Sequence, residues 1–467
     1  MSAALQPVIV GAGPAGIRAA QTLLRHGLRP LLIDEAARAG GQIYRQPPAH
    51  FQRSKESLYG FEAARADAVH QAMNGMLNSV DYRPNTLVWN AEAGRLDVLQ
   101  QSRTSTVPYA QLIVATGATD RVLPFSGWTT PGVYSLGGAQ VALKFQGCAI
   151  GSRVVFMGTG PLLYLVAYQY AKAGADVVAV LDSATLGDQM AALPALLRQP
   201  AVLAKGLYYV AWLRAHGVRL QGAVRPVRVL GQTRVTGVVW HGAQGEQTLA
   251  CDAIGLGYGL RSETQLADIL GCRFHFDALQ AAWLPQRDAA GRSSVAGVYL
   301  AGDGAGIMGA DAAEWAGERA ALALLQDARI SLGAASRDRA ATLERQLART
   351  QRFRVGLERA FPLPTDWAAQ APDDLVICRG EEVTAGDLRR TAKATGATEI
   401  NRLKALSRVG MGRCQGRMCA HAAAEVLAHC SGQSVQQVGR LRGQAPIKPI
   451  PFALVQPVAA IAQEEAA

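Results

Sequence analysis

The sequence predicts an α/β protein with two Rossmann-like dinucleotide-binding domains and a small, mostly helical module near its C-terminal end. Three observations predict this organisation. A glycine-rich turn lies between two short apolar runs near the N-terminus, a second copy of the pattern begins after residue 150, and cysteines gather beyond residue 375. A chain of 467 residues has room for roughly two to four domains.

Composition and charge indicate a folded protein of the cytoplasm. Hydrophobic residues make up 49% and charged residues 18% of the chain, which provides a large core and gives no signature of disorder. No apolar run approaches the roughly 20 residues that span a bilayer, and the N-terminus lacks the features of a signal peptide. We therefore expect a cytoplasmic location, with membrane contact at most peripheral at the inner face of the cytoplasmic membrane. The net charge of +11 is scattered and aromatic residues are only 6%, so no nucleic-acid partner is expected.

The most specific motif lies between residues 7 and 34. An apolar run leads into the turn Gly11-Ala12-Gly13-Pro14-Ala15-Gly16, a helical pattern follows, and a second apolar run ends at Asp34 and Glu35. The three glycines suit a tight turn, close approach of the backbone to a pyrophosphate, and close packing of helix on strand. The pyrophosphate would lie at the helix N-terminus, where free N–H groups favour anions, and Asp34 would accept hydrogen bonds from a ribose.

Three further motifs follow in order along the chain. Gly40, Gly41 and Gln42 come after the second apolar run, a third run ends in Ala115-Thr116-Gly117, and a fourth ends in Gly302-Asp303-Gly304. A helix is expected to begin near Asp311. The set resembles the glutathione- and thioredoxin-reductase-like flavoproteins, whose FAD domain is discontinuous in sequence.

That resemblance implies FAD as the cofactor, with Asp303 on its ribitol and the following helix directed at the flavin. A helix N-terminus at that place would stabilise negative charge on the cofactor. The candidate cofactor-binding residues are Gly11, Gly13, Pro14, Ala15, Gly16, Asp34, Glu35, Gly41, Gln42, Ala115, Thr116, Gly117, Gly302, Asp303 and Ala310.

Residues 152–182 repeat the strand–turn–helix–strand pattern with a change. Gly158 and Gly160 are present, but Leu163 stands at the third glycine position, where it would separate helix from strand and crowd a pyrophosphate. Asp182 lies near the usual ribose-binding place, and no arginine follows it to attract a 2′-phosphate. Two alternatives stay open: NAD(P) binding at Gly158, Gly160 and Asp182, or a retained fold whose site is weakened or redirected.

The sequence identifies no catalytic residue. Neither active-disulfide pattern of the reductase class occurs, because residues 40–60 contain no cysteine and Cys148 stands alone. The eight histidines show no metal-ligand spacing. We therefore expect neither disulfide reduction nor oxidation of an organic substrate by this chain alone.

The C-terminal cysteines are candidate metal ligands. Cys378 and the segment that carries Cys414 and Cys419 resemble the bacterioferritin-associated-ferredoxin-like 2Fe–2S module, which begins C-x-C-E-x-V-T and ends G-M-G-x-C-Q-G-R-x-C. Gly380 stands where the second cysteine of that module belongs, and such clusters normally need four ligands. Either another side chain completes the shell, or the module persists as a packed interaction surface. The candidate substitutes are Glu381, Glu382 and His421.

Taken together, residues 5 to about 440 resemble the FAD-binding α (A) subunits of heteromeric opine, D-hydroxyproline, proline and cyanide-forming glycine dehydrogenases. The resemblance implies an electron-transfer subunit whose partner, a D-amino-acid-oxidase-like FAD subunit (β), oxidises the substrate, with or without a small iron–sulfur subunit (γ). An autonomous NAD(P)H-dependent FAD oxidoreductase and a structural scaffold subunit remain as alternatives. The expected divisions are an FAD domain in two parts (1–120 and 261–330), a second dinucleotide-type domain (121–260), a helical linker (331–372), the cluster-type module (373–440) and a tail (441–467).

Overall fold

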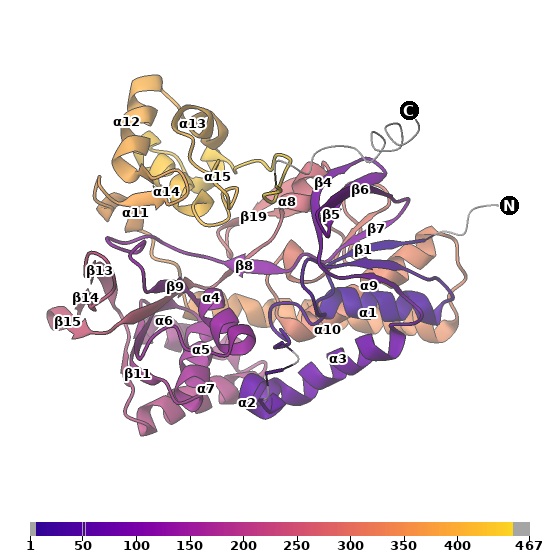
Figure 1. Ribbon diagram of the computed structural model, residues 1–467, viewed down its shortest axis with the longest axis horizontal. Coiled ribbons are helices and arrows are strands. Elements are labelled where there is room, and N and C mark those ends of the chain that lie inside the picture. Colours follow the sequence, from indigo (N-terminus) through magenta and orange to yellow (C-terminus); the bar gives the residue numbers. More distant parts are fainter. Residues whose placement is uncertain (1–5, 49, 52, 452–467) are drawn as a thin grey trace, which may run out of the picture.

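The structure is a computed structural model that describes residues 6–48, 50–51 and 53–451. Two α/β domains lie side by side, and a mostly helical C-terminal module packs against the region where they join (Figure 1). The predicted fold class is confirmed. Within the described ranges, no helix is long and apolar enough to cross a membrane.

The first domain is built on a five-stranded parallel sheet. Its strands, in spatial order, are β20 (Val298–Leu300), β7 (Leu112–Val114), β1 (Val8–Val10), β2 (Leu31–Ile33) and β3 (Asp81–Arg83). Alternate residues of the central strands enter two separate cores, so both faces of the sheet are buried. One core contains helices α1 (Pro14–Arg25), α3 (Ala63–Met76) and α9 (Ala310–Asp327). The other contains the antiparallel strands β4 (Thr86–Glu92), β5 (Arg95–Gln100) and β6 (Arg103–Pro108).

The second domain repeats this plan. Its parallel sheet has the order β12 (Arg219–Gln221), β11 (Asp176–Asp182), β10 (Arg153–Thr159), β16 (Ala253–Tyr258) and β9 (Val133–Ser135). Helices α4 (Leu136–Val141), α5 (Pro161–Lys172) and α7 (Pro200–Ala215) share a core with one face. The opposite face of this sheet shares a core with three antiparallel strands, β13 (Arg225–Leu230), β14 (Gly237–Gly242) and β15 (Gly245–Ala250).

Two short antiparallel strands connect the domains. The chain leaves the first domain through β8 (Ala118–Asp120) and returns through β17 (Leu260–Ser262). The first domain is therefore discontinuous in sequence, as the resemblance to the reductases implied. The other elements between residues 55 and 285 are α2 (Lys55–Tyr59), η1 (Gly60–Glu62), η2 (Ala142–Gln146), α6 (Leu186–Leu196), α8 (Gln265–Ile269), β18 (Phe274–Asp277) and β19 (Ala282–Pro285).

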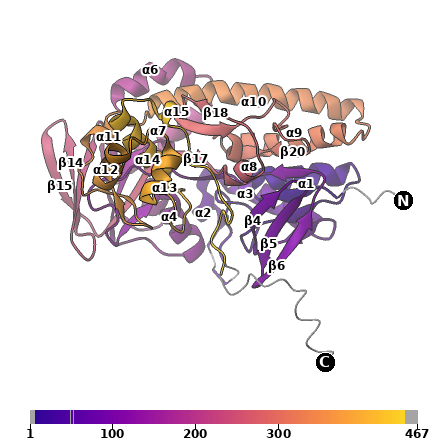
Figure 2. The ribbon, with the colours of Figure 1, turned by 90° about the horizontal axis from the view of Figure 1, so that it is seen from above.

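A long helix, α10 (Ala334–Ala360), braces the two domains. It packs against α9 of the first domain and α6 of the second, and Figure 2 shows it running along one edge of the molecule. Close packing on α6 requires a glycine, because a Cβ on Gly356 would lie 2.8 Å from the Cβ of Ala195. The segment predicted as a linker thus holds the domains in a fixed relation.

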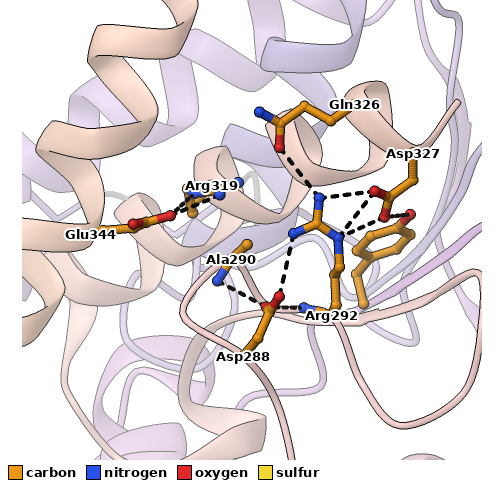
Figure 3. Close-up of polar contacts among 8 residues, drawn as sticks. Asp288, Ala290, Arg292, Arg319, Gln326, Asp327 and Glu344 are labelled. Carbon is orange, nitrogen blue, oxygen red and sulfur yellow. Dashed lines mark hydrogen bonds and ion pairs between the residues drawn. The ribbon is translucent and has the colours of Figure 1, made fainter. Parts of the chain in front are cut away.

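Polar contacts fix helix α9 at its far end and along its length (Figure 3). Arg292, just before β20, donates to Asp327 at 2.8 Å and also contacts Asp288. The hydrogen bond from Arg292 lowers the pKa of Asp327 below its usual value. Arg319 of α9 donates to Glu344 of α10 at 2.8 Å. These bonds hold the helix whose N-terminus follows Asp303.

The C-terminal module consists of short helices around a two-stranded hairpin. Its elements are α11 (Trp367–Gln370), β21 (Val376–Cys378), β22 (Val383–Thr384), α12 (Ala385–Thr395), α13 (Ile400–Ser407), α14 (Ala420–Ser431) and α15 (Val435–Val438). Helix α12 starts at a capping box in which Thr384 and Asp387 each bond the other's backbone N–H.

The predicted tail returns to the first domain over its described part. The backbone N–H of Ile447 donates to the carbonyl of Trp89 at 2.9 Å, and Ile447 is buried in the core beneath β4–β6. Lys448 forms an ion pair with Glu35. Residues 441–451 therefore form a strap across the first domain, whereas residues 452–467 of the predicted tail lie outside the described residues.

Candidate cofactor site

The turn between β1 and α1 has the geometry of a nucleotide cradle. Gly11 has φ +106°, and a Cβ there would lie 2.3 Å from the carbonyl oxygen of Ala115. A Cβ on Gly16 would lie 1.8 Å from the carbonyl oxygen of Gly11. Both positions therefore require glycine so that the turn can pack between β7 and α1.

Gly13 is different, because the protein itself does not require a glycine there. Its φ is −80°, and the nearest atom to a Cβ would be the Cα of Gly41 at 3.6 Å. Gly13 caps α1, Pro14 is the first helical residue, and no side chain bonds the free N–H groups of that end. A residue with no side chain at this place leaves the helix N-terminus open to a pyrophosphate.

Asp34 holds this turn in place. One carboxylate oxygen accepts from the backbone N–H of Ala12, and the other accepts from Ala36 at 2.7 Å. Burial raises the pKa of Asp34, while these two backbone donors act against that rise. Glu35 is exposed and pairs with Lys448. Asp34 and Glu35 are thus both bonded to other parts of the protein, in addition to the ribose contact that the sequence predicts for Asp34.

The next predicted motif meets the turn directly. Gly41 has φ +65°, and a Cβ on it would lie 2.9 Å from the Cα of Gly13. The N–H of Gly40 donates to the carbonyl of Ala12 at 2.8 Å. Gln42 is exposed, and its side-chain oxygen accepts from Arg45 at 2.7 Å. Gly41 is therefore part of the cradle wall, whereas the side chain of Gln42 lies on the surface.

The ends of β7 and β20 complete the site. The Thr116 hydroxyl donates to the carbonyl of Glu263 at 2.7 Å, and a Cβ on Gly304 would lie 2.8 Å from the Thr116 oxygen. Gly302 packs on Ala15, since a Cβ there would lie 3.0 Å from the Ala15 Cβ. The carboxyl ends of these parallel strands thus converge beside the glycine turn, where nucleotides bind in such sheets.

Asp303 shapes the start of α9. One of its carboxylate oxygens accepts from the N–H groups of Met308 at 2.8 Å and Gly309 at 3.1 Å. Gly309, with φ +94°, precedes the first helical residue, Ala310. No side chain caps this helix end, so its N–H groups remain available to a ligand.

The second dinucleotide fold has a different interior. Asp182 is fully buried and accepts hydrogen bonds from Thr159 at 2.7 Å and Tyr164 at 2.8 Å. Burial raises its pKa. Leu163, at the third glycine position, is fully buried in the core between helix and sheet. The oxygens of Asp182 are thus already engaged by protein donors at the place where a ribose would need them.

The structure brings the three C-terminal cysteines together. The thiol of Cys419 shares hydrogen bonds with both Cys378 and Cys414. These bonds lower the pKa of Cys378 to about 6 and that of Cys414 to about 5, and they raise the pKa of Cys419. Gly380 lies against Gly412, with 3.3 Å between its Cβ position and the Gly412 Cα.

Two of the three proposed substitute ligands form ion pairs with other side chains. Glu381 pairs with Arg408 at 2.7 Å, and His421 lies 3.1 Å from Glu425. Over the part of the chain that the structure describes, no group of three or more His, Cys, Asp or Glu side chains is placed to hold a metal ion. Cys378, Cys414 and Cys419 remain predicted ligands only.

One buried ion pair at this junction escaped the sequence analysis. Arg417 binds Glu263 through two bonds, of 2.6 and 3.0 Å, and links the C-terminal module to the strand end beside Thr116. The side chains are 15% and 10% exposed. The available signal was the charged pair Arg261 and Glu263 directly after an apolar strand.

Comparisons with known proteins agree with this geometry. Residues 5–317 match the family model described as pyridine nucleotide-disulphide oxidoreductase, and residues 375–458 match the sarcosine oxidase A3 domain. The protein is thus an FAD-dependent oxidoreductase of the two-dinucleotide-domain class. The second match covers most of the segment expected to form a ferredoxin-like module and extends beyond its predicted end at residue 440.

The relatives define the family more closely. The chain is 35% identical to the opine oxidase A subunit of Agrobacterium tumefaciens, over 96% of this chain and 90% of that protein. It is 36% identical to hydrogen cyanide synthase subunit HcnB of Pseudomonas protegens, over 97% of this chain and 98% of that protein. The chain belongs to the family of these subunits, which confirms the resemblance predicted from the motifs.

Solved structures show the same fold. The crystal structure of L-proline dehydrogenase from P. horikoshii matches with a TM-score of 0.73 and 19% identity, covering 97% of this chain and 79% of that one. Thioredoxin reductase of T. acidophilum matches with a TM-score of 0.51 and 22% identity, covering 69% of this chain and 98% of that one. The second match is confined to about the length of the two α/β domains.

Proposed function

We propose that this chain is the FAD-containing electron-transfer subunit of a heteromeric dehydrogenase that acts on amino acids or opines such as octopine, nopaline or hydroxyproline-type compounds. The substrate is oxidised on a partner subunit that resembles D-amino-acid oxidase. One observation carries the choice of role: the acidic residue of the first cradle, Asp34, is partly exposed, whereas Asp182 of the second is fully buried. The names of the relatives, each of them one subunit of a larger enzyme, support the heteromeric assembly.

The chain's own residues supply binding and orientation. The turn at Gly11–Gly16 and the N-terminus of α1 would hold the pyrophosphate, and Asp303 with the start of α9 would lie toward the flavin end. When bound, FAD supplies a carrier that accepts electrons and releases them again. The uncapped N-terminus of α9 favours negative charge near that end of the site.

The finer assignments stay predictions. A 2Fe–2S cluster would have three thiolate ligands and a glycine in place of the fourth, so iron analysis of the purified protein decides whether one is present. The β and γ partners are proposed from the family resemblance, and a cytoplasmic location is proposed from the sequence.

Anaerobic mixing with nicotinamide nucleotides tests the electron-transfer role against that of an autonomous reductase. We expect the flavin absorbance of the FAD-loaded chain to remain unchanged with NADH or NADPH, because Asp182 is fully buried and Leu163 stands at the third glycine position. We also expect no amine oxidation by the isolated chain. Rapid bleaching by either nucleotide would establish the reductase alternative instead.

An exposed apolar surface on the second domain supports association with a partner subunit. Leu186, Met190, Leu193 and Leu197 lie on α6 or at its end and are 75, 73, 42 and 56% exposed. Their spacing of three and four residues places them on one helix face. Contiguous exposed apolar side chains of this kind mark interfaces in soluble proteins.

Replacing Leu186 and Met190 together by glutamate is expected to weaken association with the partner by at least about tenfold, because two charges would then enter an apolar interface. Co-purification and sedimentation measure the association. Leu279→Glu, at a residue 38% exposed on the first domain, is the control. Unchanged assembly of the double variant would place the partner interface elsewhere.

A further inference from the structure

A cavity of about 90 Å³ lies where the C-terminal module meets the first domain. Its walls come from the strands that connect the domains, the hairpin of β18 and β19, and helix α14. Basic side chains from the connecting strands, from α14 and from the segment after α15 line it. They are Arg121, Arg261, His421 and Arg440.

Two of these arginines have only neutral partners. Arg121 is 5% exposed and donates to the backbone carbonyl of Gln280 at 2.6 Å. Arg261 donates to the backbone carbonyls of Gly416 at 3.5 Å and Arg417 at 3.1 Å. Among the described residues, neither guanidinium forms an ion pair with a carboxylate.

The nearby acids are already engaged by other cations. Glu263 is bound by Arg417 at 2.6 Å, and Asp268 is bound by Arg440 at 2.5 Å. Glu425 lies 3.1 Å from His421. Arg121 and Arg261 therefore form no ion pair of their own. Carboxylates attract them only without direct contact, Glu263 for Arg261 and Glu358 and Glu425 for Arg121.

An arginine cannot relieve this by losing its proton near neutral pH. Burial lowers the pKa of Arg121 to about 10, which leaves the side chain charged under ordinary conditions. Burial also lowers the pKa of Arg261. A buried charge without a directly bonded counter-ion is costly, and guanidinium groups match the planar oxygens of carboxylates and phosphates.

We propose that this cavity binds a small anion with a carboxylate or phosphate group, held between Arg121 and Arg261. Ser262 and Thr264 also line the cavity and offer hydroxyl groups. The indole N–H of Trp283, another lining residue, is buried and has no hydrogen-bond partner among the described residues. The site thus combines two cations with additional donors, a set suited to anion oxygens.

The cavity also contacts the turn that follows Asp303. The Ser262 hydroxyl accepts from the N–H of Gly306 at 3.0 Å. Gln280, whose backbone carbonyl binds Arg121, accepts from the N–H of Ile307 at 3.0 Å through its side chain. An anion that repositions Arg121 or Ser262 therefore acts on the segment between Asp303 and Met308, whose N–H groups bond Ser262 and Gln280.

Calorimetric titration of the full-length, FAD-loaded protein tests the proposal. Inorganic phosphate and pyruvate are the two probes, and chloride at equal ionic strength is the reference. Loading with FAD beforehand keeps phosphate out of the flavin cradle. Saturable binding of one probe is expected. The probe that binds more tightly shows whether the site prefers a phosphate or a carboxylate.

Arg121→Gln and Arg261→Gln are each expected to weaken that binding by about 10- to 100-fold, the effect of losing a charged hydrogen-bond donor. Arg413→Gln, at an exposed arginine of the same module, is expected to bind like the unaltered protein. Arg121→Lys and Arg261→Lys keep a positive charge if a glutamine variant fails to fold, and they should show intermediate affinity. No saturable binding of either probe, or equal affinity in the Arg121, Arg261 and Arg413 variants, would overturn the proposal.

Discussion

Gly13→Ala is expected to give a stable, correctly folded protein that binds FAD about 10- to 100-fold more weakly. The added Cβ has room in the protein, with its nearest neighbour at 3.6 Å, and the φ of −80° suits alanine. The methyl group would instead stand at the N-terminus of α1, where the pyrophosphate must approach the backbone. Losing one charged hydrogen bond at that place accounts for the expected change in affinity.

Equilibrium dialysis measures FAD affinity, and thermal unfolding of the FAD-free protein measures folding. Gly75→Ala, at an exposed helical glycine with no atom within 4 Å of its Cβ position, is the matched control and should retain full affinity. Gly16→Ala should fail to fold, because its Cβ would lie 1.8 Å from a backbone oxygen. Normal FAD affinity in Gly13→Ala would show that the cofactor does not lie against this turn.

Glu263→Gln is expected to destabilise the junction between the C-terminal module and the first domain by about 3–5 kcal/mol, because it leaves the buried Arg417 without its counter-charge. Chemical denaturation measures the free energy of unfolding. Arg408→Gln removes an ion pair of similar length, with Glu381, in which the arginine side chain is 67% exposed. This change should lower the free energy of unfolding by less than about 1 kcal/mol. Equal losses in the two variants would show that burial does not strengthen the pair.

The same pair predicts a pH dependence with a definite sign. Burial acts to raise the pKa of Glu263, but Arg417 and Arg261 outweigh it and hold that pKa below its usual value of 4.5. The pair's contribution is therefore fully present above pH 4.5 and is lost as the pH falls through the lowered pKa. This part of the acid-induced loss of stability should be missing from Glu263→Gln.

The first nucleotide site could be predicted from sequence because its determinants are local. Gly11 and Gly16 lie in one turn, and their spacing in the sequence predicts the close backbone contacts that the structure shows. The convergence of Thr116 and Asp303 on that turn could also be predicted, since both follow short apolar strands of a parallel sheet.

Other features depend on contacts between distant parts of the chain. Leu163 indicated a changed second site, but the sequence does not show that Thr159 and Tyr164 engage Asp182. The strap that brings Lys448 to Glu35 joins residues 413 positions apart. No periodicity or spacing in the sequence predicts such a pairing, because the two residues meet only when distant parts of the chain pack together.

For the C-terminal cysteines, the sequence indicated which residues belong to one motif but not the contacts around them. The motif spacing predicted Cys378, Cys414 and Cys419 as candidate metal ligands, which stays a prediction; in the structure the thiol of Cys419 bonds the other two. The spacing did not reveal how closely the backbone at Gly380 approaches Gly412, or that Glu381 is paired with Arg408. Those contacts depend on how the hairpin packs against the loop before α14.

Anaerobic addition of the amino-acid or opine substrate to the purified assembly tests most directly whether electrons reach this chain. The loss of flavin absorbance should be compared between the unaltered assembly and one that contains Gly13→Ala, in which weaker binding lowers the amount of FAD that this chain retains. We expect a larger loss in the unaltered assembly, by the amount of flavin that the variant fails to retain. An equal loss in both assemblies would contradict electron transfer to this protein.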